Sequence, residues 1–182
     1  MRTILPQEEN PALREIARDI PIKDIPSKRI QSLIAEMKEL LSREEYGVAL
    51  AAPQLGEAIQ LFIVSGRALA RDKRNASDEP DKKEEEIPPL PDQVYINPEL
   101  VKISRKKYEK HEGCLSIRGK WGIVPRAEKA TVRAYDEEGR LFTRGASGFL
   151  AHVFQHELDH LNGILYIDKA TELYDDKPEE QE

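Results

Sequence analysis

A segment near the C-terminus constrains the fold more than any other part of the sequence. It has the sequence SGFLAHVFQHELDHLNG (147–163) and mixes apolar with polar residues. Its apolar side chains recur at intervals of three and four residues, the spacing of one face of an α-helix: Phe149, Leu150, Val153, Phe154, Leu158 and Leu161. Ser147 is a favourable N-cap residue, and Gly163 is a favourable residue for ending the helix after Asn162. The sequence therefore predicts a core helix around which the remaining elements must pack.

The same predicted helix carries the sequence H-E-L-D-H (156–160). Residues four apart lie one turn from each other on the same face, so the imidazoles of His156 and His160 can reach one cation. Glu157 lies one step round the helix and can face a water molecule beside that cation without binding it. A histidine pair at this spacing is also compatible with the surface of an amphipathic helix. The intervening glutamate and the apolar flanks favour a metal site.

A hydrolytic metal site needs three protein ligands and one open position, so a third ligand must come from elsewhere in the chain. No histidine follows His160, and the downstream acidic residues, such as Asp168 and Glu172, stand in no ligand-like pattern. Upstream, the only cysteine, Cys114, directly follows a glycine that lets the backbone turn sharply. A lone cysteine is often a small buried side chain without function. We nevertheless predict Cys114 as the third ligand.

The rest of the sequence predicts a mixture of helix and strand. Residues 27–43 have the spacing of an amphipathic helix, with Ser27 as its N-cap, after an extended lead-in arm over residues 11–26. Runs of β-branched and aromatic residues broken by Pro, Asp and Gly predict strands at 59–64, 94–104, 123–139, 140–144 and 164–168, with a hairpin turn at 136–139. The expected fold class is α+β, with mixed, mostly antiparallel sheets around a central metal-binding helix.

The length of 182 residues, with 39% hydrophobic residues, fits a single catalytic domain, which we place at residues 1–170. Residues 66–92 contain a basic run, an acidic run and a Pro-rich end, so we expect a charged, mobile insertion there, with a partner-binding role as a weaker alternative. Residues 171–182 are expected to form a disordered acidic tail.

Charge and cysteine content limit the partners and the compartment. The net charge of −6 gives no indication of a basic face, so no direct contact with nucleic acid is expected. The sequence contains no long apolar segment and no signal peptide, so we expect no membrane association. A single cysteine allows no internal disulfide, which is typical of proteins in a reducing compartment. These features predict a cytoplasmic protein.

Three separated motifs together resemble the peptide deformylase family. They are G-V-A-L-A-A-P-Q (47–54), E-G-C-L-S (112–116) and Q-H-E-L-D-H (155–160), in the order and with the spacing found in that family. The resemblance runs from about residue 10 to residue 169. It implies a deformylase-like fold and an enzyme that removes the N-formyl group from the N-terminal formyl-methionine of newly made polypeptides, releasing formate.

The resemblance implies a role for each residue of the site. Cys114, His156 and His160 would bind one divalent metal ion, with Fe(II) expected and Zn, Ni or Co as substitutes. Glu157 would act as the proton shuttle. Gln54 and the backbone N–H of Leu115 would stabilise the oxyanion that forms when water attacks the formyl carbon.

Further positions are expected around the substrate or behind the metal. Arg126 matches a family arginine that pairs with Asp159, and the alternative for Arg126 is an exposed position on a strand. Trp121 either lines the substrate groove or fills a surface recess. The residues expected to contact the substrate are Val48, Ala49, Glu112, Gly113 and His152.

The sequence also departs from the family pattern. Ala49 replaces a glycine, and its methyl group could crowd a bound peptide. Arg118 stands where the family often has proline. The basic C-terminal helix of one family branch is absent, so ribosome contact through such a helix is not supported. Two alternatives stay open: a metallopeptidase that cuts internal peptide bonds, and a metal-stabilised binding protein without catalysis.

Overall fold

The computed structural model describes residues 2–76 and 90–175. It contains a five-stranded sheet of order β1-β2-β3-β6-β7 and a three-stranded sheet of order β4-β5-β8, in which every strand pair is antiparallel. The strands of the larger sheet are β1 (Ala49–Ala51), β2 (Leu61–Val64), β3 (Gln93–Ile103), β6 (Lys129–Tyr135) and β7 (Leu141–Ser147). Those of the smaller sheet are β4 (Lys107–Cys114), β5 (Ile117–Ala127) and β8 (Glu172–Asp175).

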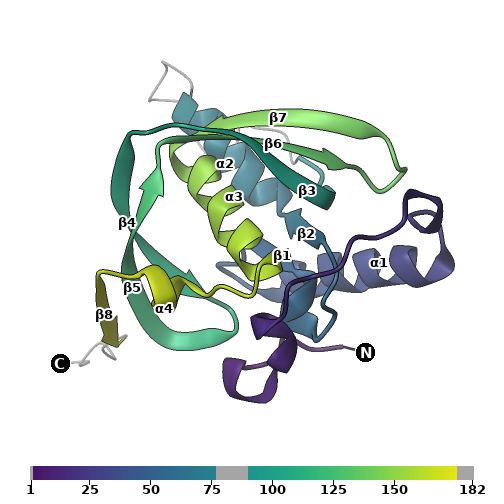
Figure 1. Ribbon diagram of the computed structural model, residues 1–182, viewed down its shortest axis with the longest axis horizontal. Coiled ribbons are helices and arrows are strands. Elements are labelled where there is room, and N and C mark those ends of the chain that lie inside the picture. The colour runs from purple at the N-terminus through teal and green to yellow at the C-terminus, as the bar shows by residue number, and fades with distance from the viewer. Residues whose placement is uncertain (1, 77–89, 176–182) are drawn as a thin grey trace.

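Among the described residues, four α-helices accompany the sheets, with short 3₁₀ turns in the N-terminal arm and before β2. The helices are α1 (Lys28–Arg43), α2 (Gly66–Ala76), α3 (Gly148–Leu161) and α4 (Tyr166–Lys169). Helix α3 runs through the middle of the molecule and contacts strands of both sheets (Figure 1). The expected α+β architecture around a central helix is confirmed. None of the helices in the described ranges is both long and apolar enough to cross a membrane.

Strand β2 lies between two helices, which explains why its sequence is apolar without alternation. Phe62 and Val64 pack into the core cluster around α3, whereas Leu61 and Ile63 pack into the cluster around α1. Successive strand residues point to opposite faces, so both faces of this strand are covered.

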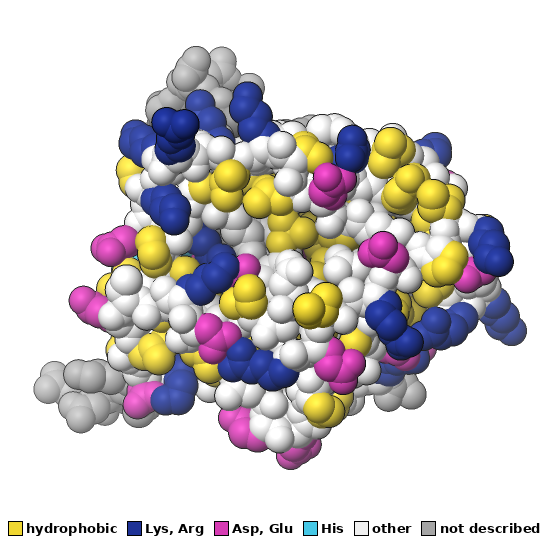
Figure 2. Space-filling view, viewed as in Figure 1, with side chains coloured by type: hydrophobic (Ala, Val, Ile, Leu, Met, Phe, Trp, Pro, Cys, Tyr) yellow, Lys and Arg dark blue, Asp and Glu magenta, His cyan; other side chains and the backbone are white. Residues whose placement is uncertain are grey.

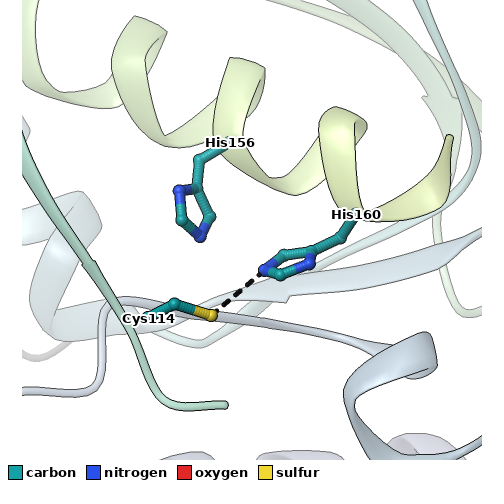
Figure 3. Close-up of side chains that lie close together, drawn as sticks. All are labelled: Cys114, His156 and His160. Atoms are coloured by element: carbon teal, nitrogen blue, oxygen red, sulfur yellow. Dashed lines mark hydrogen bonds between the residues drawn. The ribbon is translucent and has the colours of Figure 1, made fainter. Parts of the chain in front are cut away.

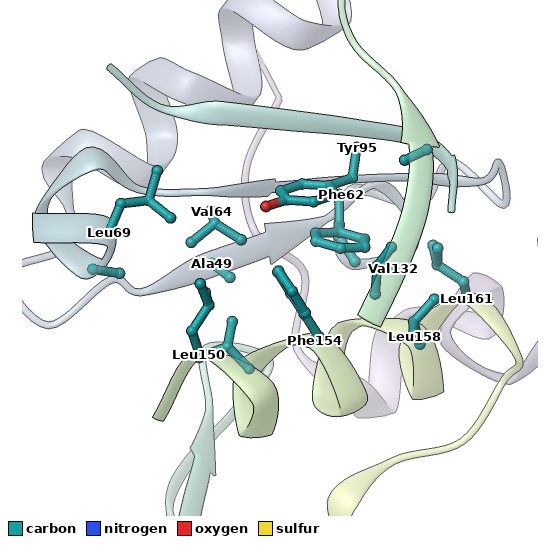
Figure 4. Close-up of a cluster of buried hydrophobic side chains, with 14 of the residues drawn as sticks. Ala49, Phe62, Val64, Leu69, Tyr95, Val132, Leu150, Phe154, Leu158 and Leu161 are labelled. Atoms are coloured by element: carbon teal, nitrogen blue, oxygen red, sulfur yellow. The ribbon is translucent and has the colours of Figure 1, made fainter. Parts of the chain in front are cut away.

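Aromatic packing fixes α3 against the five-stranded sheet (Figure 4). The rings of Phe62 and Tyr95 stack with centroids 4.5 Å apart, and Phe154 meets Tyr95 edge-on at 5.3 Å. Ser147 precedes the helix without a side-chain cap bond, and Gly163 ends it with a φ of +70°, as expected for a left-handed terminating residue.

Helix α1 also begins as expected, because Ser27 Oγ accepts a hydrogen bond from the N–H of Ile30 at 3.4 Å. Other local predictions were wrong. Much of the lead-in arm forms 3₁₀ turns, and the expected strand at 164–168 is largely replaced by α4, where Asp168 accepts a bond from the N–H of Leu165 at 2.9 Å. Residues 172–175 of the expected disordered tail form β8 on the edge of β5.

The expected mobile insertion at 66–92 begins as a helix that belongs to the core. Ala68 and Leu69 in α2 are buried with the residues around α3, and the guanidinium of Arg71 lies 4.6 Å from the ring centroid of Phe149. Residues 66–76 of the expected insertion therefore form a helix, and its Ala68 and Leu69 pack into the core. Residues 77–89 lie outside the described residues.

We predict that Leu69→Ala lowers the free energy of unfolding by about 2–5 kcal/mol, the usual cost of this truncation in a packed core. Leu69 is 4% exposed, whereas Leu141 is 57% exposed and provides the matched control. Leu141→Ala should change the free energy by less than about 0.5 kcal/mol. Urea titrations of both variants make the comparison, and equal effects would show that α2 does not contribute to the core.

Candidate metal centre

The three predicted ligands lie together, although Cys114 is far from the histidines in sequence. His156 and His160 project from α3 and Cys114 lies at the end of β4, with all ligand atoms within 4.8 Å of one another (Figure 3). Cys114 Sγ lies 3.3 Å from His160 Nε2. A thiolate and two imidazoles suit zinc or ferrous iron, and three protein donors leave a position for a further ligand. The donor set therefore fits a catalytic metal ion.

The pKa values of His156 and His160 are shifted in opposite directions. Burial and the charge of His156 lower the pKa of His160 well below its usual value. At His156 burial also acts to lower the pKa, but hydrogen bonds to Cys114 and Glu112 outweigh it and raise the pKa well above its usual value. Metal-binding imidazole is neutral, so metal binding at this site is coupled to the protonation of His156.

Glu112 and Arg126 form a buried ion pair directly behind the histidines. Arg126 donates from Nε and Nη2 to the two carboxylate oxygens of Glu112 at 2.6 and 3.0 Å. The second oxygen also accepts a hydrogen bond from His156 Nδ1 at 2.7 Å. This bond leaves Nε2 as the free ring nitrogen of His156, which is the usual arrangement behind a metal-bound histidine.

The predicted pair of Arg126 and Asp159 is present. Arg126 Nη1 donates to Asp159 Oδ2 at 2.5 Å, and the other oxygen of Asp159 accepts from Lys169 Nζ at 2.6 Å. Arg126 is 4% exposed, so its alternative position on an exposed strand surface is wrong. The chain of contacts links β4, β5, α3 and α4 through one guanidinium.

Glu112 and His152 were expected at the substrate, but the structure places them in contact with each other. His152 Nε2 lies 2.5 Å from Glu112 Oε1, without the alignment of a hydrogen bond. Burial acts to raise the pKa of Glu112, but the close contact with His152 and the hydrogen bonds from His156 and Arg126 hold it well below its usual range. Both oxygens of Glu112 thus face the chain itself, and Glu112 positions the metal helix.

Glu157 lies between His156 and His160, the two predicted histidine ligands, in sequence and is 4% exposed. Its Oε2 atom is buried and has no hydrogen-bond partner among the described residues. Burial raises the pKa of Glu157 to about 7, and the charge of His156 acts in the opposite direction. A carboxyl group with this pKa can both accept and release a proton near neutral pH.

Gln54 reaches the site from the turn after β1. Its Oε1 accepts a hydrogen bond from the N–H of Ala51 at 2.9 Å, which fixes the orientation of the amide. Its Nε2 then lies 3.5 Å from Cys114 Sγ and 3.4 Å from Ser116 Oγ. Leu115 follows the ligand, and its side chain packs against the cluster around α1.

Of the remaining predicted substrate residues, Val48 and Ala49 lie at the start of β1, and Gly113 directly precedes Cys114. Val48 is partly buried, and the methyl group of Ala49 packs into the cluster around α3, so it points into the core. At Gly113 a Cβ atom would lie 3.2 Å from the ring of Trp121, so the absence of a side chain lets that ring approach the backbone beside Cys114. Trp121 is 38% exposed.

Two further residues, Gln155 and Tyr166, hold the metal helix in place, and neither was predicted as part of the site. Gln155 donates to the carbonyls of Ala127 and Ala151 and accepts from the N–H of Ala127, which ties α3 to β5. Tyr166 stacks on His156 with ring centroids 6.2 Å apart, and its hydroxyl donates to the Lys120 carbonyl. Gln155 could have been noticed as a buried amide within the third motif, whereas no local pattern marks Tyr166.

Comparisons with known proteins agree with this geometry. The family described as Polypeptide deformylase matches residues 1–176. The chain belongs to that family. A peptide deformylase from Desulforudis audaxviator is 38% identical over 168 residues, which cover 92% of this chain and 93% of the relative. The crystal structure of a peptide deformylase from Legionella pneumophila has 34% identity and a TM-score of 0.74, and covers 94% of this chain and 86% of that one. The crystal structure of a peptide deformylase from Synechococcus elongatus has 31% identity and a TM-score of 0.72, and the match covers 92% of this chain and 78% of that one.

Polypeptide deformylases are metal-dependent hydrolases that act on formylated amino termini of newly made polypeptides. The match covers the elements that carry all three predicted ligands, so the family explains why a cysteine on a strand faces a histidine pair on a helix. A metallopeptidase of a different family, which sequence analysis left open, is set aside by this membership.

We predict that Arg126→Met lowers the free energy of unfolding by about 3–5 kcal/mol, because Glu112 and Asp159 stay buried and lose the guanidinium between them, with Lys169 remaining on Asp159. Metal affinity should fall by roughly 10- to 100-fold as His156 loses its fixed orientation. Arg133→Met, which breaks the exposed pair with Glu99, is the matched control and should change stability by less than about 1 kcal/mol. Denaturant titration and metal analysis test both effects.

Proposed function

We propose that this chain hydrolyses the N-formyl group of N-terminal formyl-methionine on newly made polypeptides and releases formate and a free amino terminus. The observation that carries the proposal is the convergence of Cys114, His156 and His160 within 4.8 Å beside a buried, protonatable Glu157. Membership of the deformylase family supplies the reaction class.

One divalent ion per chain would be held by Cys114, His156 and His160, with Fe(II) as the proposed native metal and Zn, Ni or Co as substitutes. Such an ion acts as a Lewis acid and makes a water molecule more acidic. The thiolate donor supports iron or zinc over magnesium or calcium, which prefer oxygen ligands.

Glu157 is the proposed proton shuttle. Its buried carboxylate accepts the proton of the attacking water, and its pKa of about 7 lets it return that proton to the leaving amine. Because Oε2 has no partner among the described residues, the proton need not displace an existing hydrogen bond there.

The oxyanion that forms at the formyl carbon is proposed to accept hydrogen bonds from the Gln54 amide and the backbone N–H of Leu115. Support comes from Gln54, whose Oε1 is already bound by Ala51, so its Nε2 is the end directed toward Cys114. Donors held in place before the reaction stabilise developing charge without reorganisation.

Val48, Gly113 and His152 remain proposed substrate neighbours, together with the backbone of Ala49. The contact of Glu112 with Arg126 and His156 supports a positioning role instead. We also propose a single catalytic domain over residues 1–170. A cytoplasmic location is proposed because a free thiol ligand requires a reducing compartment.

The function is tested by formate release from a short formyl-Met peptide by protein purified without oxygen. The matched acetyl-Met peptide should be cleaved far more slowly, and a peptide blocked at both ends should not be cut internally. Internal cleavage would indicate a metallopeptidase, and no turnover by metal-loaded protein would indicate a binding protein.

Replacing Cys114 by serine should preserve the fold but greatly reduce bound metal, because a hydroxyl is far less acidic than a thiol. Elemental analysis of the purified variant gives the occupancy, and circular dichroism checks the fold. His111→Ala removes an exposed histidine from the same strand and should leave occupancy unchanged. Full occupancy in Cys114→Ser would refute the assignment of the third ligand.

Glu157→Gln should lower kcat by at least the roughly 10² to 10⁴ that general acid/base catalysis contributes, because glutamine cannot take up a proton. Metal content and stability should survive, since glutamine has nearly the same size. The exposed substitution Glu138→Gln is the control for loss of one negative charge. Turnover of the metal-loaded Glu157→Gln protein within about tenfold of the parent would exclude the shuttle role.

A further inference from the structure

The net charge of −6 conceals an uneven distribution of charge along the chain. Residues 77–89 and 176–182 contain ten of the 34 acidic side chains but only three of the 28 basic ones. The remaining residues are therefore slightly basic, so the negative net charge of the whole chain does not exclude a basic face.

Basic side chains concentrate where β3 passes into β4. We call residues 101–110, with the sequence VKISRKKYEK, the basic ribbon. It contains five cations against one carboxylate, Glu109, and all five are exposed: Lys102, Arg105, Lys106, Lys107 and Lys110. Figure 2 shows Lys and Arg side chains over the upper left of the molecule, where β3 joins β4 in Figure 1.

These cations are available to a partner. Within the described part of the chain, only Lys106 has an ion-pair partner, Glu128, at the long distance of 3.7 Å. Three apolar side chains are also unusually exposed on the ribbon, namely Val101, Ile103 and Tyr108 at 42, 49 and 43%. Lys106 Nζ lies 4.7 Å from the ring centroid of Tyr108, so a cation and an aromatic face are presented together.

The backbone of the basic ribbon is held in place at both ends. Ile103 pairs with Ala130 of β6, and Lys107 pairs with Ala127 of β5. Between them, the N–H of Ser104 donates to the Lys129 carbonyl at 3.0 Å, and further bonds join residues 128 and 129 back to the turn. A partner would thus meet a preformed array of charges, with little ordering cost in the backbone.

We propose that the basic ribbon binds RNA. The ribbon consists of two extended arms, residues 101–103 and 107–110, joined by a bend over residues 104–106. Its five cations therefore lie on both sides of a corner, where they can contact several phosphates of a nucleic acid strand. Tyr108 adds an aromatic surface on which a base can stack. An anionic membrane is the less favoured partner, because the exposed apolar side chains are only half exposed and have no deep-inserting neighbours on the ribbon.

The position of the basic ribbon fits the proposed function. The choice of RNA over other polyanions rests on that function. Formylated amino termini emerge from the ribosome, whose surface is largely RNA. Lys110 and the metal ligand Cys114 lie on the same strand, four residues apart, which corresponds to about 13 Å. RNA bound to the ribbon would therefore hold the metal centre near newly made chains.

The test compares two sets of three charge removals. Arg105→Gln, Lys107→Gln and Lys110→Gln together alter the ribbon, whereas Arg18→Gln, Lys23→Gln and Lys28→Gln remove three exposed cations elsewhere. Fluorescence anisotropy with a labelled single-stranded RNA is measured over a range of salt concentrations. The ribbon triple should weaken binding at least tenfold and reduce the salt slope by about 2, as expected for three lost phosphate contacts.

The control triple should bind RNA with an affinity within about twofold of the parent. Both triples should release formate from a short formyl-Met peptide at the parental rate. The two assays therefore judge RNA binding and deformylation separately. Tyr108→Ala should weaken RNA binding while leaving the salt slope unchanged, because it removes stacking and no charge. The proposal is overturned if the parent does not bind the RNA, if both triples lose affinity equally, or if the parent binds only phosphatidylserine vesicles.

Discussion

The guanidinium of Arg126 is the point at which the separate parts of this molecule are joined. It lies between carboxylates from β4 and α3, which are 4% and 9% exposed, and it receives little help from solvent. Burying these charges is costly, and only their mutual attraction and full set of hydrogen bonds offset that cost. The relative placement of strand and helix is thus tied to one cation, and any shift between them separates buried charges.

Apolar packing sets the depth of the metal helix α3 against the sheet, and polar contacts set its rotation. The aromatic cluster of Phe62, Tyr95 and Phe154 sets how deeply α3 lies against the large sheet, but apolar contacts are not directional. Gln155 and Asp159 provide the directional bonds on another side of the helix. Together they leave α3 no freedom to rotate, so His156 and His160 point toward β4 before any metal arrives.

The sequence predicted those elements whose residues follow a regular periodicity or spacing. It did not predict elements and contacts that depend on partners far away in the chain. Helix α3 was predictable because its apolar face and H-E-L-D-H run lie within one segment. Strand β4 was not, because its polar sequence forms a strand only by pairing with β5. The charged helix α2 was missed because the buried apolar side chains described on it, Ala68 and Leu69, are too few to form a helical pattern. The position of Glu112 depends on Arg126 and the two histidines, which no local motif reveals.

The hairpin of β4 and β5 links the metal centre to the outer surface. Along β4 the chain passes from the basic ribbon, through the buried carboxylate of Glu112, to Cys114, the proposed metal ligand. The exposed end carries Lys107 and Lys110, which form no ion pair within the described part of the chain, while the inner end is fixed by Arg126 and His156. Since the buried ion pair lies between the two ends, contacts made on the ribbon need not disturb the ligand geometry. One strand can therefore serve a surface that meets a partner and a site that requires fixed distances.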